Sequence, residues 1–265
     1  MNLTNKQIRA RARELLDGNI FGKDWIKSVF LMILMNVIIL VPAYLIFTPV
    51  ESIVSPALHS VFDQSLLVNQ VIADVIILYI ELIIIALISN LLAGPLMVGF
   101  SSVHLDLVRN GDNISIRKFF NGFKNFFENF QLGLMTMLHT FLWSLLFIIP
   151  GIYVSYSYAM AYHVKAEHPD YRWQQCLDES ERLMSGNRFR LFKLHMSFMG
   201  WIFIGAFAFL GVGSLWVTPY SQVSTAIFYE QIKAEQDTNI VDFETVATRA
   251  TDPVVIELSP LDPRS

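Results

Sequence analysis

Long stretches of this chain carry no charged side chain, and shorter segments that contain charges separate them. The uncharged stretches cover 28–50, 82–105, 129–164 and 194–229, with lengths of 23, 24, 36 and 36 residues. A helix that crosses a membrane needs about 20 predominantly apolar residues in succession. The first two stretches therefore predict one membrane span each, and the last two are long enough for two spans each.

The two longer stretches must each reverse direction near the middle to hold two spans. Pro150 and Gly151 stand in the middle of the third stretch. Because proline ends a helix and glycine permits a reversal, they predict a hairpin turn there. In the fourth stretch we expect the turn at 211–214, with Pro219 in the first turn of the following helix. The predicted spans are 27–49, 82–108, 129–149, 151–166, 194–212 and 215–233.

The distribution of basic residues agrees with six spans. Cytoplasmic loops of membrane proteins are enriched in Lys and Arg. With six spans and both ends of the chain in the cytoplasm, all 19 Lys and Arg residues fall on the cytoplasmic side. A seventh span within 71–109 would move Arg117, Lys118 and Lys124 to the outside, so we reject it.

Composition divides the chain into two parts. Hydrophobic residues make up 54% and charged residues only 16%, against about 25% charged in soluble domains. The net charge of −4 arises in 237–265, which carries six acidic and two basic residues. That segment has three prolines and no helical periodicity, so we predict an integral membrane domain over 1–236 and an acidic, disordered cytoplasmic tail over 237–265.

A weak threefold pattern runs through the predicted membrane domain. Three amphipathic segments, 15–25, 119–130 and 183–193, each contain a glycine after apolar residues, and each leads to a proline. The next basic residue follows that proline after 14 or 15 positions in every case; the pairs are Pro95 with Arg109, Pro150 with Lys165, and Pro219 with Lys233. The pattern predicts a degenerate repeat of one interfacial helix and two spans.

Three segments are expected to form amphipathic helices at the cytoplasmic membrane surface. Thr4 and Gln7 form a capping-box pair before the first. The second is the Phe-rich segment 116–130, and the third is expected to begin with Asp170 as its N-cap. Helices of this kind contact anionic lipid headgroups through basic residues, so we expect the lipid bilayer and its anionic headgroups to be partners.

Several quoted segments resemble a known family. They are "GPLMVGF", "FNGFKNFF", "FLWSLLFIIPGIYVSYSYAMAYHV", "ERLMSGNRFRLFKLHMSFMGW" and "GSLWVTPYSQVSTAIFYEQI". In order and spacing, over about 14–233, the chain resembles the bacterial integral membrane family called domain of unknown function 975. The family's common "D-N-P" after the fourth span reads Glu167-His168-Pro169 here. The resemblance implies a multi-pass protein of the bacterial cell membrane and assigns it no activity.

Five residues are candidates for a polar network or a transport path: Glu81, Pro95, His104, Asp106 and His139. His104 lies near Asp106 and Arg109, which fits an ion network at the cytoplasmic boundary or a proton relay. His139 is expected either to form hydrogen bonds between helices or to act in a relay. Glu81 lies either at the outer boundary or buried within a span. The kink at Pro95 is expected to serve packing or to open a small cavity.

The sequence thus predicts an all-α bundle of six transmembrane helices with three interfacial helices. Motifs for nucleotide hydrolysis, zinc proteolysis and serine hydrolysis are missing. The single cysteine, Cys176, excludes an internal disulfide and a site with several thiolates. We expect a non-enzymatic protein without cofactor, metal or nucleic acid, which organises or assists a membrane partner or lipid. The alternatives are a small transporter of a lipid or solute, and an enzyme that acts on lipids.

Overall fold

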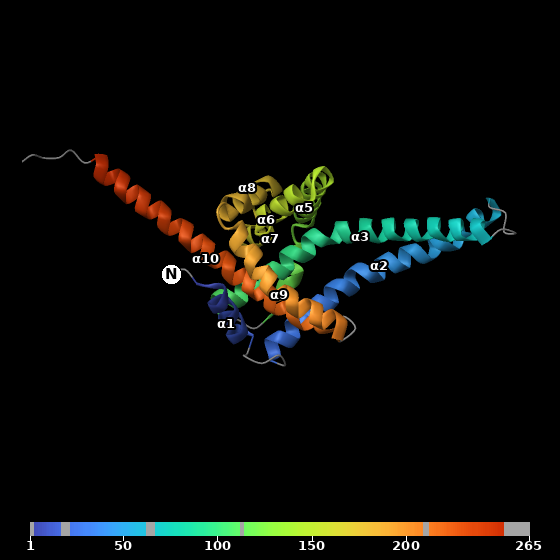
Figure 1. Cartoon of the computed structure of the whole chain (residues 1–265), viewed down its shortest axis with the longest axis horizontal. Coiled ribbons are helices and arrows are strands. Elements are labelled where there is room, and N and C mark those ends of the chain that lie inside the picture. The colour runs from blue at the N-terminus through green and yellow to red at the C-terminus, as the bar shows by residue number, and fades with distance from the viewer. Residues whose placement is uncertain (1–2, 17–21, 62–66, 112–113, 209–211, 252–265) are drawn as a thin grey trace, which may run out of the picture.

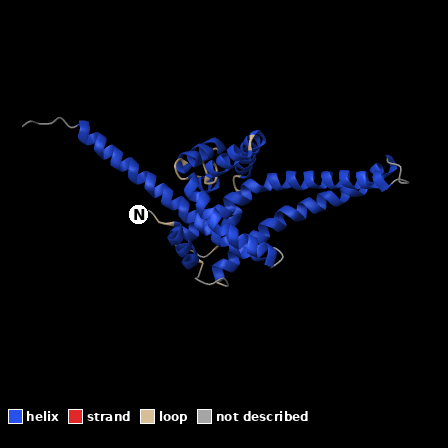
Figure 2. Ribbon diagram, viewed as in Figure 1, coloured by secondary structure: helices blue, strands red, loops and turns tan. Residues whose placement is uncertain are grey.

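The fold is all-α. The computed structural model describes residues 3–16, 22–61, 67–111, 114–208 and 212–251. Helices dominate these ranges, and none of the described residues forms a strand (Figure 2). In chain order the helices, with one 3-10 helix called η1, are α1 (Asn5–Leu15), α2 (Lys23–Val61), α3 (Leu67–Asn110), α4 (Ile116–Phe119), η1 (Phe120–Phe123), α5 (Phe126–Leu146), α6 (Ile148–Ser157), α7 (Ala161–Glu167), α8 (Trp173–Met184), α9 (Arg188–Ala208) and α10 (Val212–Thr251).

Helices α2 and α3 form a long hairpin that projects from a compact body, while α10 projects from the body on the opposite side (Figure 1). The hairpin helices contain 39 and 44 residues. At 1.5 Å per residue they extend over about 58 and 66 Å, against a hydrocarbon core of about 30 Å. Both are long and apolar enough to cross a membrane. Near the tip, His59 and Asp74 lie 3.9 Å apart across the hairpin.

The hairpin helices are longer than the predicted spans 27–49 and 82–108. Helix α2 continues through Pro42, Pro49 and Pro56. Each proline removes one backbone hydrogen bond, and an apolar helix that gains packing from a neighbour tolerates this loss. The prolines recur every seven residues, close to two helical turns, so they lie near one face of the helix.

The reversal between α5 and α6 corrects the predicted turn at Pro150 and Gly151. The chain turns at Phe147, which has an extended backbone with φ −158° and ψ 147°. Pro150 lies in the first turn of α6, where a missing N–H is tolerated. A Cβ atom on Gly151 would lie 2.8 Å from the Cα of Ser144, so this glycine serves the close approach of the two helices.

The predicted span 151–166 is not one helix, because the chain leaves the helix between α6 and α7. The hydroxyl of Ser180 on α8 donates to the carbonyl of Ser157 at 2.8 Å and accepts from the N–H of Met160 at 3.1 Å. A side chain that inserts into the backbone hydrogen-bond ladder interrupts a helix in this way. The interruption therefore arises from a contact between segments far apart in the sequence.

The last two predicted spans, 194–212 and 215–233, correspond to α9 and to the first half of α10. Part of the turn predicted at 211–214 lies outside the described residues, and its remainder, 212–214, already belongs to α10. Pro219 lies inside α10, beyond the first turn in which it was expected. Pro219 is buried. Its packing against neighbouring helices therefore helps α10 to tolerate the backbone hydrogen bond that proline removes.

Helices α1 and α8 bury their apolar faces within the protein. The predicted capping box of α1 is confirmed, with the Thr4 N–H donating to Oε1 of Gln7 at 2.8 Å. Ile8 and Ala12 of α1 are buried, and α1 contacts α10. Helix α8 begins at Trp173, preceded by Arg172, so Asp170 is not its N-cap. The Phe-rich segment forms α4, η1 and the start of α5 as separate pieces.

Helix α10 continues to Thr251, which differs from the predicted disorder from residue 237 onward. Residues 233–251 contain Ala, Glu and Gln but no proline or glycine, so nothing in their backbone chemistry interrupts a helix. Pro253 follows two residues after the helix ends. This agrees with the rule that proline disfavours a helical backbone at the residue before it. The remainder of the predicted tail, 252–265, lies outside the described residues.

Candidate functional site

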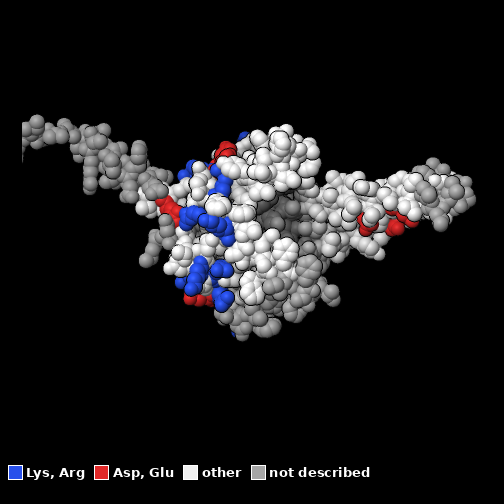
Figure 3. Space-filling model, in the orientation of Figure 1, with Lys and Arg blue, Asp and Glu red and all other residues white. Residues whose placement is uncertain are grey.

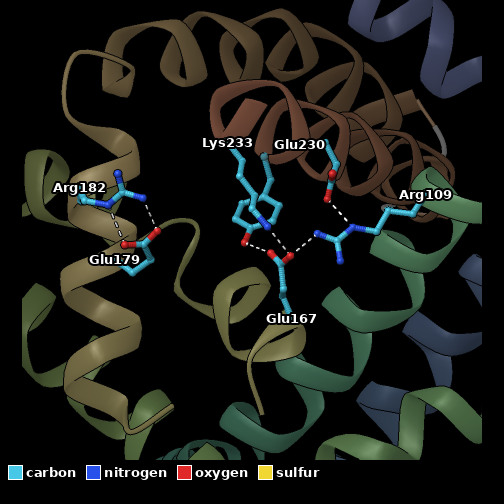
Figure 4. A network of polar contacts seen from close by, with 7 residues as sticks. Arg109, Glu167, Glu179, Arg182, Glu230 and Lys233 are labelled. Carbon is cyan, nitrogen blue, oxygen red and sulfur yellow. Dashed lines mark hydrogen bonds and ion pairs between the residues drawn. The ribbon is translucent and has the colours of Figure 1, made fainter. Parts of the chain in front are cut away.

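The C-terminal ends of α3 and α7 meet the middle of α10 in a network of charged side chains, which we call the Glu167 network. It comprises Arg109, Glu167, Tyr229, Glu230 and Lys233, and Figure 4 labels all of these except Tyr229. Arg109 lies in the last turn of α3, and Glu167 is the last residue of α7. Tyr229 and Lys233 are four residues apart on α10 and so share one helix face.

Glu167 is the centre of the network. Its Oε1 accepts hydrogen bonds from Nη2 of Arg109 at 2.8 Å and from Nζ of Lys233, and its Oε2 accepts one from the Tyr229 hydroxyl at 2.6 Å. The Nε of Arg109 also donates to Glu230 at 2.7 Å. Three helices that are distant in sequence are therefore joined through one carboxylate.

The network holds Glu167 in its charged form. Burial alone would raise the pKa of this carboxyl, but the hydrogen bonds from Lys233, Tyr229 and Arg109 together outweigh burial and lower the pKa to about 2. A carboxylate with so low a pKa is a weak proton acceptor near neutral pH. The geometry thus favours a structural junction between helices over general-base chemistry.

Lys165 holds the segment that follows α7. Its side chain is almost completely buried, and its ammonium donates to the carbonyl oxygens of Pro169, at 3.1 Å, and Tyr171. The ring of His168 stacks on that of Tyr171, with centroids 4.5 Å apart. The three residues Glu167-His168-Pro169 therefore have distinct structural roles. Glu167 forms ion pairs, the ring of His168 stacks on Tyr171, and the carbonyl oxygen of Pro169 accepts a hydrogen bond from Lys165.

The comparisons with known proteins concern the segment that supplies most of this network. Residues 145–236 match the family described as Protein of unknown function (DUF975). This match confirms the resemblance to domain of unknown function 975 for 145–236, which is part of the range of about 14–233 over which the sequence resembles that family. The DUF975 segment contains Glu167, Tyr229, Glu230 and Lys233, while Arg109 comes from the preceding part of the chain. Neither the curated proteins nor the solved structures gave a match.

The structure places two of the sequence candidates near the network without including them in it. Nε2 of His104 lies 2.8 Å from the Ser28 hydroxyl, which joins α3 to α2, and its Nδ1 lies 2.8 Å from the carbonyl of Phe100. Asp106 pairs with Lys118 at 3.0 Å. The expected grouping of His104, Asp106 and Arg109 thus resolves into three separate contacts.

His139 and Glu81 lie elsewhere. His139 on α5 places Nδ1 2.7 Å from the carbonyl of Met135, and its ring contacts those of Tyr158 and Trp173. Glu81 is half-buried on α3, 14 residues or about 21 Å along the helix from Pro95. Among the described residues Glu81 has no hydrogen-bond or ion-pair partner. The structure does not bring Glu81, Pro95 and His139 together.

Pro95 lies in a close backbone contact between α3 and the segment from η1 to α5. A Cβ atom on Gly94 would lie 1.9 Å from the carbonyl oxygen of Asn129, and one on Gly122 would lie 2.0 Å from that of Pro95. Only glycine permits backbones to approach this closely. The glycines that form this contact, called here the glycine seam, are Gly94, Gly99, Gly122 and Gly133.

Sequence reasoning missed Glu167, Tyr229 and Glu230 as a unit. One signal was present, because Arg109 and Lys233 were recognised as equivalent basic residues that follow Pro95 and Pro219 at the same spacing. Both basic residues contact the same carboxylate in the structure. The sequence marks Glu167 only as the residue where the family's common motif has Asp, and this resemblance names no partner for it.

Proposed function

We propose that this chain is a multi-pass protein of the bacterial cell membrane, with six spans and both ends of the chain in the cytoplasm. The observation that carries the proposal is the exposure of α2 and α3. In the most apolar 18-residue stretch of each helix, only 17% and 6% of the residues are buried. Soluble proteins rarely expose apolar surface on this scale, whereas lipid would cover it.

The distribution of charge supports the same orientation. Lys and Arg side chains gather on the side of the body away from the hairpin, and the visible face of the hairpin has none (Figure 3). Apolar side chains around the reversal between α5 and α6 are exposed as well, with Phe147 at 69% and Ile149 at 80%. These features support further membrane-embedded segments beyond α2 and α3.

The threefold repeat remains part of the proposal. Its support is that Arg109 and Lys233 occupy equivalent positions in the pattern and meet at Glu167, two residues after Lys165. The glycines of the pattern differ in role: Gly122 belongs to the glycine seam, and Gly186 adopts a φ of +77° after α8. We infer copies that have diverged in their connecting segments.

Within the membrane the protein organises or assists a partner protein or a lipid, without catalysing a reaction. The saturated Glu167 network supports a structural role for the charged residues at its centre. The length of the hairpin supports contact with partners, because at about 60 Å it exceeds the hydrocarbon core and places part of α2 and α3 beyond it. No specific observation favours the transporter alternative along Glu81, Pro95 and His139.

The proposal is tested by extracting the protein from its own membrane in native nanodiscs and identifying bound molecules by mass spectrometry. An unrelated six-span protein serves as the control. We expect a protein or lipid to be retained in stoichiometric amount relative to this control. Retention of a water-soluble solute alone would contradict the proposal and indicate transport, and the same molecules in both samples would also contradict it.

A further inference from the structure

A cavity of about 520 Å³ lies beside the Glu167 network, between the end of α3 and the segment from α4 to α5. Its size is within the range of small-molecule sites. Polar side chains from both sides line it, among them Ser102, Asp106, Lys118, Asn121, Lys124 and Asn125. The cavity thus lies at the boundary between the apolar part of α3 and the basic side of the body.

The charges around this cavity favour an anion. Four basic residues line it against two acidic ones; they are Arg109, Lys118, Lys124 and Lys165 against Asp106 and Glu167. Pairing with Asp106 and Glu167 offsets the charges of Lys118 and Arg109, and the buried ammonium of Lys165 donates to the carbonyl oxygens of Pro169 and Tyr171. Lys124 is exposed and has no ion-pair partner among the described residues. Its ammonium is therefore available to a ligand.

The start of α5 lies beside the cavity, and its first turn carries one acidic residue, Glu128. Asn125 precedes α5 without a side-chain capping hydrogen bond, and the N–H of its side-chain amide donates to the carbonyl of Pro169 at 3.1 Å. The first backbone N–H groups of a helix have no partner within the helix, and the helix dipole makes this end positive. Lys124 and this helix end lie next to each other in the chain.

Exposed apolar side chains are close in sequence to the cavity residues, outside the set that lines the cavity. Phe120 and Phe127 stand on either side of Asn121, Lys124 and Asn125 in the sequence, and they are 43% and 65% exposed. A ligand with an anionic head and an apolar body would match both features. Membrane lipids with a phosphate headgroup have this chemistry, and they occur at the level in the membrane where basic residues follow a span.

We propose that this cavity binds the phosphate headgroup of an anionic lipid, with Lys124 facing the phosphate and the acyl chains along Phe120 and Phe127. The proposal rests on the proposed function, because it needs the end of α3 to lie at the cytoplasmic surface of the membrane. It deepens that function by naming the class of lipid and the site.

The test compares two variants of the full chain in nanodiscs of phosphatidylcholine with increasing phosphatidylglycerol. Lys124→Gln removes a charge at the cavity, and Lys6→Gln removes one from exposed α1, outside the cavity. We expect native mass spectrometry to show about fivefold weaker retention of phosphatidylglycerol for Lys124→Gln, as for the loss of one basic contact. Lys6→Gln should retain it like the wild type. Equal retention by all three proteins would overturn the proposal.

A competition experiment separates a lipid from a soluble phosphate compound. Glycerol 1-phosphate added in excess should leave the bound phosphatidylglycerol in place, because it lacks the apolar body. Full displacement would overturn the lipid proposal and assign the site to a soluble phosphate compound. A protein with the proposed membrane orientation but no preference for phosphatidylglycerol would overturn the site alone, whereas a different orientation would overturn the proposed function.

Discussion

At the scale of single residues, Glu167 joins parts of the chain that no local rule connects. Its carboxylate accepts from Arg109 on α3 and from Tyr229 and Lys233 on α10. Ion pairs at an exposed surface contribute little to stability, but a buried charge that loses its partner is costly. The Glu167 side chain is only 12% exposed. Loss of its ion pairs should therefore be costly, as for a buried charge.

Replacing Glu167 should therefore destabilise the fold. We expect Glu167→Gln to lower the free energy of unfolding by about 3 kcal/mol, because Arg109 and Lys233 keep their charges but lose their shared partner. Denaturation in detergent, followed by circular dichroism, measures this. The matched control is Glu179→Gln, which breaks an exposed pair with Arg182 within α8 (Figure 4) and should cost less than about 1 kcal/mol. Equal losses for the two variants would contradict the central position of Glu167.

The same residue predicts a dependence of stability on pH. The pKa of Glu167 is about 2 in the folded protein against an ordinary value of 4.5. A carboxyl with a depressed pKa stabilises the fold above its ordinary pKa, and this contribution disappears as the pH falls from 4.5 toward 2. In that range the wild type should lose stability more steeply than Glu167→Gln, as measured by thermal unfolding in detergent. Parallel pH profiles would contradict the lowered pKa.

At the scale of helices, the glycine seam determines how closely α3 approaches α5. Gly94 and Gly133 lie on the two helices, and a Cβ atom on Gly133 would lie 2.8 Å from the Cα of Gly94. Since both close partners are backbone atoms, no side chain can move aside to make room. The helices would have to separate instead, and the contacts on either side of the seam would be lost with them.

We expect Gly94→Ala to lower the free energy of unfolding by about 2 kcal/mol, in the range of overpacked cores. Gly200→Ala is the control, because Gly200 lies in α9 with no heavy atom within 4 Å of the added Cβ. Alanine favours a helix over glycine by about 1 kcal/mol, so this control should be neutral or stabilising. Chemical denaturation of both variants in one detergent makes the comparison. Similar stabilities for the two variants would show that the helices do not touch at the seam.

Helices whose determinants are local could be predicted from the sequence, and those with distant determinants could not. The capping pair Thr4 and Gln7 identified the start of α1, and the uncharged stretches located α2 and α3. The break between α6 and α7 depends on the hydroxyl of Ser180, which arrives from another helix. The turn at Phe147 was misplaced because Pro150 is tolerated in a first helical turn as readily as it ends a helix.

For the candidate site, sequence reasoning found the basic residues but not their arrangement. The spacing after a proline indicates Arg109 and Lys233, whereas the partners of Glu167 become evident only when α3, α7 and α10 meet. His104 was expected beside Asp106 because they share a helix. Its Nε2 faces Ser28 on α2 instead, a partner 76 residues away. Such pairings depend on helix packing, which a single sequence does not specify.

At the scale of the whole molecule, the central claim is a membrane protein with the hairpin tip on one side and the basic side of the body on the other. One exposed residue is available for labelling on each proposed side of the membrane: Ser60 near the hairpin tip, and Thr238 on α10. The native Cys176 is buried, and burial raises the pKa of its thiol to about 11. A buried thiol with a raised pKa reacts slowly, so it leaves a low background for labelling.

The most direct test is labelling of Ser60→Cys and Thr238→Cys in intact bacterial cells with a maleimide that does not cross membranes. Detergent-treated cells show that each cysteine can react. We predict that Ser60→Cys reacts in intact cells and that Thr238→Cys reacts only after detergent is added. Labelling of both cysteines in intact cells, or protection of both, would contradict the arrangement with the hairpin tip outside and the Glu167 network at the cytoplasmic surface.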